Sequence, residues 1–259
     1  MSVDVAPAFF TVFIGLFGLI IGSFLNVCIH RLPIKQSVVT PRSRCPHCGY
    51  LLAWYDNVPL VSYAVLGGRC RSCRAPISLR YPFVEALTGA VFVWHALVFG
   101  LTPLLPVRLA FACALIVLFA IDLEHQILPD RITLPGIVIG FACSLALPPG
   151  PLMSLAGIVA GGGILWAIAE GWYRLRKVDA MGFGDVKMLA MVGAVLGLRL
   201  VLLTFVLSTM LGGLVGVALI ATRRANLATA VPFGTMLAVA ALVASLYGDS
   251  LLAWYLSRF

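Results

Sequence analysis

The chain has 259 residues, of which 61% are hydrophobic and only 11% are charged. Because an ordinary soluble domain carries about 25% charged residues, this composition excludes a soluble globular fold and predicts that lipid surrounds most of the chain. The formal net charge of +8 would suggest nucleic acid as the partner of a soluble protein. Membrane proteins instead collect Lys and Arg in their cytoplasmic loops, so we expect no nucleic-acid partner.

Uncharged apolar runs mark the expected membrane spans. A helix needs about 20 apolar residues to cross the hydrocarbon core, and the prolines within 148–151 must divide one longer run into two helices. Eight spans follow, at 5–29, 86–107 and 109–121, two in 132–169, and then at 188–198, 200–222 and 225–248. Gly193 and Gly197 repeat at helical spacing, which predicts close helix packing in lipid. The sequence thus predicts an all-α polytopic membrane protein with about eight transmembrane helices.

The polar loop after the first span divides the chain. We expect a first transmembrane helix at 1–29, a cytoplasmic domain at 30–82 and a transmembrane enzyme domain at 83–259. If the loop faces the cytoplasm, nearly all Lys and Arg residues lie on that side, as the positive-inside rule requires, and both termini face the periplasm. The exceptions are Arg108, Arg199 and Arg258.

Two short spans meet aspartates. The run at 109–121 ends in Asp122, and the run at 188–198 follows Gly182-Phe183-Gly184-Asp185. At 1.5 Å per residue the later run covers about 17 Å, roughly half of the hydrocarbon core. The charge distribution places both aspartates at the cytoplasmic face, where ionisable groups are costly and commonly functional. The alternative is that each aspartate only marks a helix end.

A pair of carboxyl groups suits peptide hydrolysis. Two carboxyls about 3 Å apart share one proton, so the ionised group can take a proton from water while the protonated group hydrogen-bonds the scissile carbonyl. The helix dipole predicts that Asp122, at a helix C-terminus, more often holds this proton, and that Asp185, near an N-terminus, is more often ionised. Gly182 and Gly184 would allow a tight turn that gives a peptide substrate clearance.

Three more acidic residues lie in the same two loops, namely Glu124, Asp130 and Asp179. They form either a solvated rim or an acidic collar that contacts a basic segment of the substrate. The sequence pattern leaves both interpretations open.

Four cysteines form two CxxC pairs in the first cytoplasmic loop, Cys45 with Cys48 and Cys70 with Cys73. This spacing is typical of a zinc ribbon in which each turn gives two thiolates to one tetrahedral ion. A site closed by four protein ligands has no open position for chemistry, so we expect a structural Zn²⁺. Disulfides are not expected because the cytoplasm is reducing.

Eight short stretches carry a resemblance that covers most of the chain. They are residues 22–27, 41–48, 54–59, 68–73, 76–82, 121–130, 181–187 and 232–234. With these stretches the sequence resembles the type IV prepilin peptidases, bacterial inner-membrane aspartyl proteases with a Gly-x-Gly-Asp motif. Their order and number make a chance similarity improbable.

The resemblance implies an enzyme that cuts the basic leader from prepilins and pseudopilins, after a glycine, at the cytoplasmic face of the inner membrane. It maps the catalytic aspartates onto Asp122 and Asp185 and the metal ligands onto the four loop cysteines. It also implies N-methylation of the new N-terminal residue, commonly Phe, with S-adenosyl-L-methionine as the methyl donor. No Gly-rich nucleotide motif marks the donor site, which stays unknown. Residues 54–57 would either shape a pocket or pack within the loop.

Other functions remain open from sequence alone. A transporter could use the two aspartates to relay protons or bind cations, although the two halves of the chain show no obvious repeat. A leader peptidase without methyltransferase activity is a further alternative, as is a metal-binding scaffold whose aspartates do no chemistry.

Overall fold

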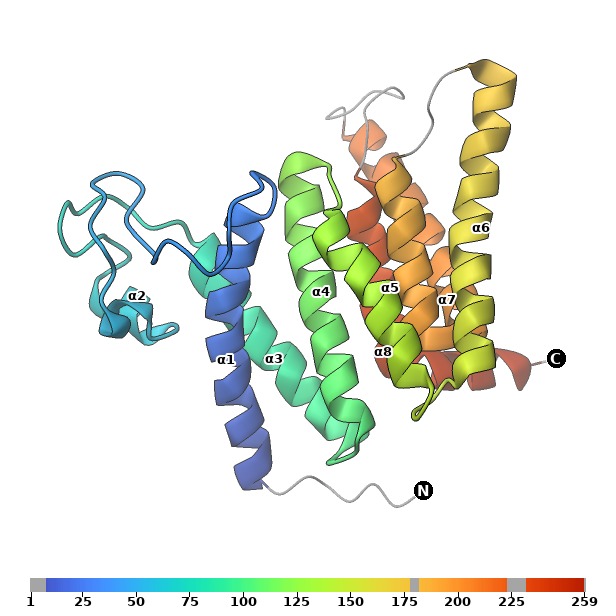
Figure 1. Cartoon of the computed structure of the whole chain (residues 1–259), viewed down its shortest axis with the longest axis horizontal. Coiled ribbons are helices and arrows are strands. Elements are labelled where there is room, and N and C mark those ends of the chain that lie inside the picture. The colour runs from blue at the N-terminus through green and yellow to red at the C-terminus, as the bar shows by residue number, and fades with distance from the viewer. Residues whose placement is uncertain (1–7, 178–181, 223–231, 259) are drawn as a thin grey trace. The chain divides into compact units, whose positions relative to one another are not determined.

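The elements of the computed structural model are helices (Figure 1). The structure describes residues 8–177, 182–222 and 232–258, and within these ranges only isolated β-bridges accompany the helices. In chain order the elements are α1 (Ala8–Arg31), η1 (Trp54–Asn57), α2 (Val61–Val65), α3 (Arg80–Phe99), α4 (Leu104–His125), α5 (Asp130–Ser144), α6 (Pro151–Arg176), α7 (Phe183–Ala221) and α8 (Phe233–Leu256). The predicted all-α fold is confirmed.

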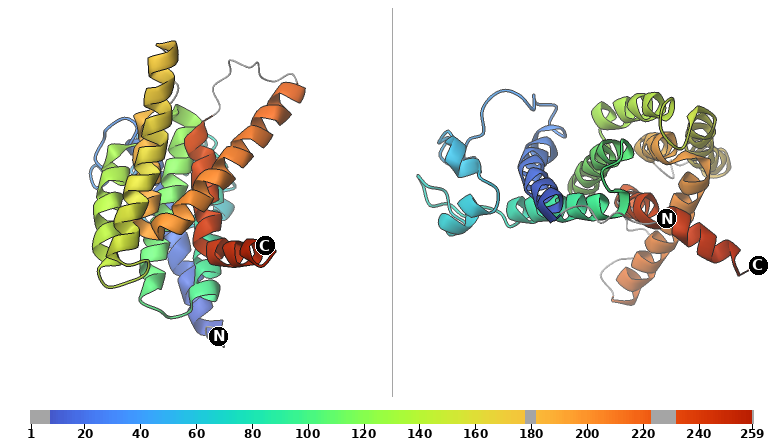
Figure 2. Two further views of the ribbon diagram at one scale, coloured as in Figure 1. Left: turned by 90° about the vertical axis from the view of Figure 1, so that its right-hand side faces the viewer. Right: turned by 90° about the horizontal axis from the view of Figure 1, so that it is seen from below.

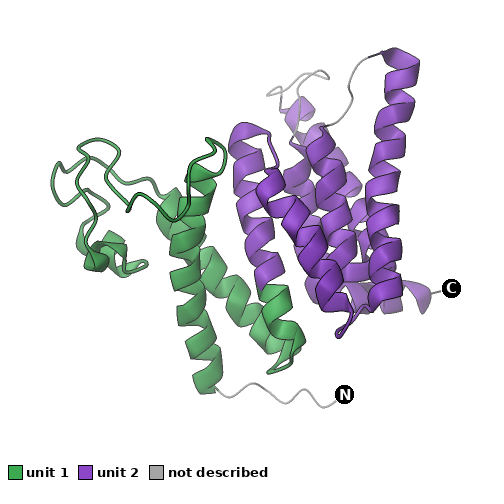
Figure 3. Ribbon diagram, viewed as in Figure 1, with its two compact units in different colours: residues 1–109 green, residues 110–259 purple. Residues whose placement is uncertain are grey.

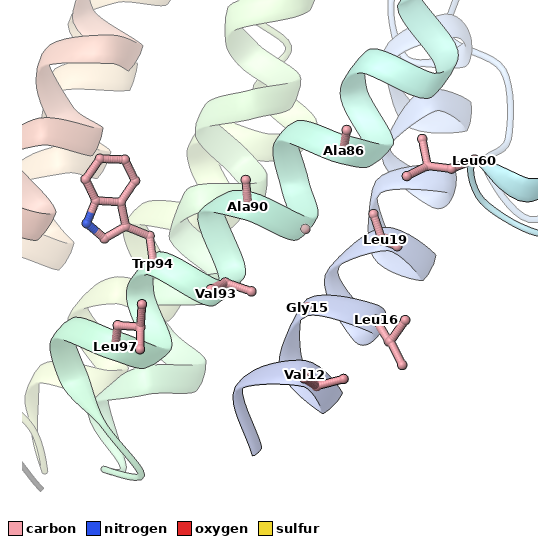
Figure 4. Close-up of a pocket in the computed structure, with 11 residues that line it drawn as sticks. Val12, Gly15, Leu16, Leu19, Leu60, Ala86, Ala90, Val93, Trp94 and Leu97 are labelled. Carbon is pink, nitrogen blue, oxygen red and sulfur yellow. The ribbon is translucent and has the colours of Figure 1, made fainter. Parts of the chain in front are cut away.

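Two compact units make up the chain, residues 1–109 and residues 110–259 (Figure 3). In the first unit α1 packs on α3 at glycines, because a Cβ at Gly22 would lie 2.7 Å from the Cα of Glu85. An apolar groove of about 610 Å³ lies between these two helices. Figure 4 shows the side chains that line it, with Trp94 at its edge. No titratable side chain lines it, so this groove is not a candidate active site.

In the second unit α7 packs against α5, α6 and α8. The backbones of α6 and α7 touch at Gly157 and Gly193, and the buried Ser154 hydroxyl donates a 2.7 Å hydrogen bond to the carbonyl of Ala194. The expectation that Gly193 permits close packing is therefore confirmed. Hydrogen bonds and close backbone contact, not a hydrophobic driving force, hold helices together in lipid.

α7 breaks at Gly197, where φ is 79° and ψ is 177°. A Cβ there would lie 2.8 Å from the Cβ of Pro149, so glycine is needed both for the backbone angle and for clearance. Figure 1 and Figure 2 show that α7 turns back at this break, so both of its ends lie at the same end of the second unit. The C-terminus of α4 and the N-terminus of α8 lie at that end too.

Six of the described helices are long and apolar enough to cross a membrane, namely α1, α3, α4, α6, α7 and α8. The chain is therefore a multi-pass membrane protein. Eight crossings would follow if α5 and each half of α7 also crossed, so the number eight stays a prediction, as do the boundaries at residues 29 and 82 and the orientation of loops and termini.

Several expected spans were wrong in their limits. The last one, expected at 225–248, ends later, because α8 continues through Asp249 to Leu256. The run at 86–107 ends earlier, because α3 stops at Phe99 before Gly100, which has a φ of 59°. α4 then has 22 residues, so the span that ends near Asp122 is not short. Arg108 misled the assignment: it lies inside α4, is buried, and places its guanidinium 5.7 Å from the ring centroid of Phe99.

Candidate active site

Asp122 lies in the last turn of α4 and is buried, with 5% of its surface exposed. Its Oδ2 accepts a 2.8 Å hydrogen bond from the backbone N–H of Thr235, in the first turn of α8. A Cβ at the preceding residue, Gly234, would lie 2.8 Å from the same oxygen. The start of α8 therefore fits closely around this carboxylate, which takes the place of a capping group for that helix.

Asp185 lies in the first turn of α7, as predicted, and is half-buried. Its backbone N–H donates a 3.2 Å hydrogen bond to the carbonyl of Gly182, the N-cap residue of the helix. Leu128 lies against both Gly184, the residue before Asp185, and Gly234, which fits against Asp122, so the two aspartates border one region. Segments separated by the whole of α5 and α6 thus bring both aspartates into one site, at the same end of the second unit.

The turn over the two glycines before Asp185 is the first turn of α7, closed by the hydrogen bond from the Asp185 N–H to the Gly182 carbonyl, and its backbone angles do not require glycine. Gly182 has a φ of −70° and a ψ of 139°, angles open to any residue, and Gly184 is part of α7. Gly184 does provide clearance, because a Cβ there would lie 2.9 Å from the Cβ of Leu128. Leu128 also lies against Gly234, where a Cβ would be 3.0 Å from its Cδ1. Leu128 therefore packs between α7, which carries Asp185, and the start of α8, which contacts Asp122.

The three acidic residues of the proposed collar differ in their surroundings. Asp130 begins α5 and forms a 2.6 Å ion pair with Lys187, so its charge is already balanced within the chain. Glu124 is exposed and lies 3.9 Å from His125 Nε2, at the limit of an ion pair. Asp179 lies outside the described residues.

The four loop cysteines come together as the spacing predicted. All four Sγ atoms lie within 4.8 Å of one another, with 3.8 Å between Cys45 and Cys73 and 4.0 Å between Cys48 and Cys70. Four sulfurs at 2.3 Å from a tetrahedral Zn²⁺ would be about 3.8 Å apart. The donor set and its spacing therefore fit a structural zinc ion.

The two CxxC turns have the same hydrogen-bond pattern, and each is closed by an isolated β-bridge. The N–H of Cys45 donates to the carbonyl of Tyr50, and the N–H of Cys70 donates to that of Ala75. Gly49 and Arg74 occupy equivalent places with φ of 72° and 58°. Backbone N–H groups of Cys73 and Ser72 lower the pKa of Cys70 to about 7, whereas burial and the other three thiols raise the pKa of Cys73 to about 11. A metal bound here would displace the remaining thiol protons.

Residues 54–57 form η1, and of these Asp56 contacts the rest of the loop through its side chain while the two aromatic residues face outward. Asp56 accepts a 2.8 Å hydrogen bond from Arg71 Nε, which connects η1 to the second CxxC turn. Trp54 and Tyr55 are largely exposed and meet edge to face at 5.6 Å. The carboxylate of Asp56 is therefore used inside the loop, and these contacts assign no site for a methyl donor.

Sequence reasoning missed the contributions of Leu128, Gly234 and Thr235. Gly234 belongs to the 232–234 stretch noted above, which gave a position but no role. The contact with Asp122 uses a backbone N–H, and no side-chain pattern encodes that donor.

Two sequence models of protein families match the chain. The model of the bacterial peptidase A24 N-terminal domain matches residues 16–99, and that of the type IV leader peptidase family matches residues 109–217. A comparison with solved structures found no match.

Three similar proteins carry the name prepilin leader peptidase/N-methyltransferase. The one from Aeromonas hydrophila is 38% identical over 94% of this chain and 93% of its own length. The one from Pseudomonas aeruginosa is 36% identical over 96% of this chain and 94% of its own length. The one from Myxococcus xanthus is 43% identical over 84% of this chain and 65% of its own length.

Proposed function

Since the chain belongs to the type IV leader peptidase family, we propose that it is an aspartic endopeptidase that removes the basic leader of prepilins and pseudopilins and N-methylates the new N-terminus. The bacterial inner membrane, with the site at its cytoplasmic face, is the proposed location. The observation that carries the peptidase activity is the junction of Asp122 and Asp185 at one end of the second unit. Membership of this family argues against the transporter.

In the proposed mechanism the two carboxyl groups share one proton. The ionised group takes a proton from the attacking water, and the protonated group donates a hydrogen bond to the scissile carbonyl and stabilises its developing negative charge. The C–N bond of the tetrahedral intermediate then breaks as the leaving amine takes up the proton that the carboxyl group had taken from water, which returns the pair to its starting state. No covalent intermediate is formed with the enzyme.

We propose that the acidic loop residues bind the basic leader, and that their contributions differ. Glu124 is exposed and suited to a basic leader, whereas Asp130 is engaged by Lys187. Asp179 is proposed as a contact because of its place in the second acidic loop of the sequence. If the leader binds these charges, reversing all three should raise the KM for a basic-leader substrate but not for one with a neutral leader.

Zinc would be held by Cys45, Cys48, Cys70 and Cys73 and would stabilise the folded loop. A site closed by four thiolates leaves the metal no substrate position. S-adenosyl-L-methionine is the proposed methyl donor because the similar proteins are named N-methyltransferases. No residue is assigned to its binding.

The decisive experiment uses the purified chain and a synthetic prepilin with a basic leader, a Gly before the cleaved bond and a Phe after it. We expect Asp122→Asn and Asp185→Asn each to reduce cleavage at least about 10³-fold, the range that acid–base groups contribute. Asp249→Asn is the matched control, since Asp249 is an exposed residue of α8. Cleavage that survives both changes would falsify the peptidase proposal.

Mass spectrometry of the product tests the second activity independently. With S-adenosyl-L-methionine present, we expect the mature N-terminus to gain the mass of one methyl group. A product that is cleaved but always unmethylated would mean that the chain is a leader peptidase without methyltransferase activity.

A further inference from the structure

A second groove in the first unit has a different character from the apolar one. It has a volume of about 550 Å³ and lies between α1 and two parts of the loop, residues 38–43 and 57–59. Its α1 side is a stripe at helical spacing, which consists of Ile20, Ser23, Phe24, Val27 and Arg31. All of its lining belongs to residues that pack within this unit.

The groove runs along α1 for the depth of one lipid leaflet. Residues 20 to 31 span about 17 Å of helix, and half of a hydrocarbon core is about 15 Å. α1 is itself a candidate membrane span with a mean hydropathy of 2.4. Ile20 and Phe24 are 59% and 49% exposed, so the deep end of the groove is apolar and open, and the end at Arg31 coincides with the end of the helix.

The shallow end carries positive charge without a carboxylate. Arg31 is 8% exposed and donates hydrogen bonds to the carbonyls of Ser37, at 3.0 Å, and Pro41, at 2.8 Å. Carbonyl oxygens satisfy its donors but bring no negative charge. Arg42 lines the same end, no Asp or Glu lines the groove, and neither arginine forms an ion pair with a described carboxylate. A buried cation in this setting favours an anionic ligand.

We propose that this groove binds one anionic phospholipid. Its phosphate lies between Arg31 and Arg42, and one acyl chain follows Phe24 and Val27 toward Ile20. Basic pockets beside a transmembrane helix on the cytoplasmic side are suited to such headgroups. The long apolar part of the groove on α1 would serve a ligand with an acyl chain and has no use for a free phosphate. Val39, which lines the groove and is 81% exposed, then meets lipid and not water.

The methyl donor fits this groove less well. Its ribose hydroxyls and adenine call for a carboxylate and for polar groups along the whole ligand, whereas here the polar groups gather at one end. Binding of S-adenosyl-L-methionine is therefore measured beside lipid binding.

The test uses the full chain in detergent, with native mass spectrometry and titration of phosphatidylglycerol or phosphatidylcholine of equal acyl length. We expect several-fold tighter binding of phosphatidylglycerol. Arg42→Gln should weaken that lipid about fivefold, the effect of one cation near the headgroup, and should leave phosphatidylcholine unchanged. Val27→Trp, which fills the apolar part without changing charge, should weaken both lipids. A thermal melt checks that each variant is folded.

The matched control is Arg44→Gln, an exposed arginine two residues from Arg42 that does not line the groove. Its binding of both lipids should equal that of the unchanged chain. The proposal is overturned if the unchanged chain shows no preference between the lipids, if Arg44→Gln loses as much as Arg42→Gln, or if folded Val27→Trp binds normally. It is also overturned if Arg42→Gln abolishes binding of S-adenosyl-L-methionine and leaves lipid binding intact.

Discussion

The surroundings of Asp122 change the argument about the shared proton. The C-terminal end of α4 alone disfavours a negative charge, but the N–H of Thr235 places the N-terminal end of α8 against the same carboxylate. Because Oδ2 accepts from this N–H, a proton on Asp122 would have to sit on Oδ1. Within the parts of the chain that the structure describes, no group donates a hydrogen bond to the Asp185 side chain, in contrast to Asp122. We therefore expect Asp122 to be the ionised member, the reverse of the expectation from the helix ends of sequence alone.

Replacing Thr235 with proline tests this point, since proline removes the N–H and is tolerated in a first helical turn. A hydrogen bond to a charged group contributes about 1.5–3 kcal/mol, so we expect cleavage to fall about tenfold or more. The loss should be largest at low pH, because a carboxylate without its donor is protonated more readily. The measurement is the rate of leader cleavage as a function of pH.

Thr235→Ala is the control for that variant. It keeps the backbone donor and removes only the hydroxyl, which bonds the carbonyl of Pro232 at 2.7 Å. We expect its pH profile to match the unchanged chain. Equal losses in both variants would mean that the hydroxyl, and not the N–H, supports the site.

The candidate aspartates and cysteines could be predicted because local spacing carries the information. A CxxC turn holds both of its thiolates on one short segment, and Asp185 follows its glycines directly. The contact of Leu128 with Gly184 and Gly234 could not be predicted, because it joins three elements that only the tertiary fold brings together. Arg108 shows the opposite failure: its charge resembled a loop position, but it is buried within α4 and lies near the ring of Phe99.

At the scale of elements, the ion pair between Asp130 and Lys187 joins the start of α5 to the first turns of α7, two residues after Asp185. Both side chains are partly exposed, so the pair adds at most about 1 kcal/mol to stability. We expect Asp130→Asn and Lys187→Met each to reduce kcat about fivefold by loosening Asp185. The double variant should lose no more than either one, because a shared interaction can be removed only once.

Glu170→Gln is the control for this cycle, since Glu170 pairs with Arg174 on the exposed surface of α6. Its kcat should be unchanged. Losses that multiply in the double variant of Asp130 and Lys187 would show that the two residues act separately, which would remove the proposed positioning role.

The contact between α6 and α7 predicts a large effect from a small change. At Gly193 an added methyl group would meet the backbone of Gly157, which cannot move without separating the helices. Overpacking costs about 1–3 kcal/mol, and a backbone obstacle places Gly193→Ala at the upper end of that range. Gly213→Ala, on the same helix with no atom within 4 Å, should be neutral or slightly stabilising. Thermal unfolding in one detergent compares the two variants, and equal melting temperatures would contradict the close contact.

At the scale of the whole molecule, the loop and the aspartate site lie in different compact units. The second unit holds Asp122 and Asp185 in long helices that pack along their length. The loop of the first unit has only a four-residue and a five-residue helix, too short to be stable in isolation. Its two CxxC turns are therefore the main structure available to hold it, and they need a metal to do so.

Removal of zinc should consequently affect the loop and spare the second unit. We expect about one zinc per chain by elemental analysis, and its loss with a strong chelator or in Cys48→Ser. Limited proteolysis should then cut within residues 38–78, while the helices from α4 to α8 stay protected, because a loop that folds with its metal unfolds without it. Cys143→Ser, in α5, is the control and should keep both the metal and the protease resistance. A loop that remains resistant after all zinc is gone would show that its own packing, including the Arg71 and Asp56 pair, is sufficient to fold it.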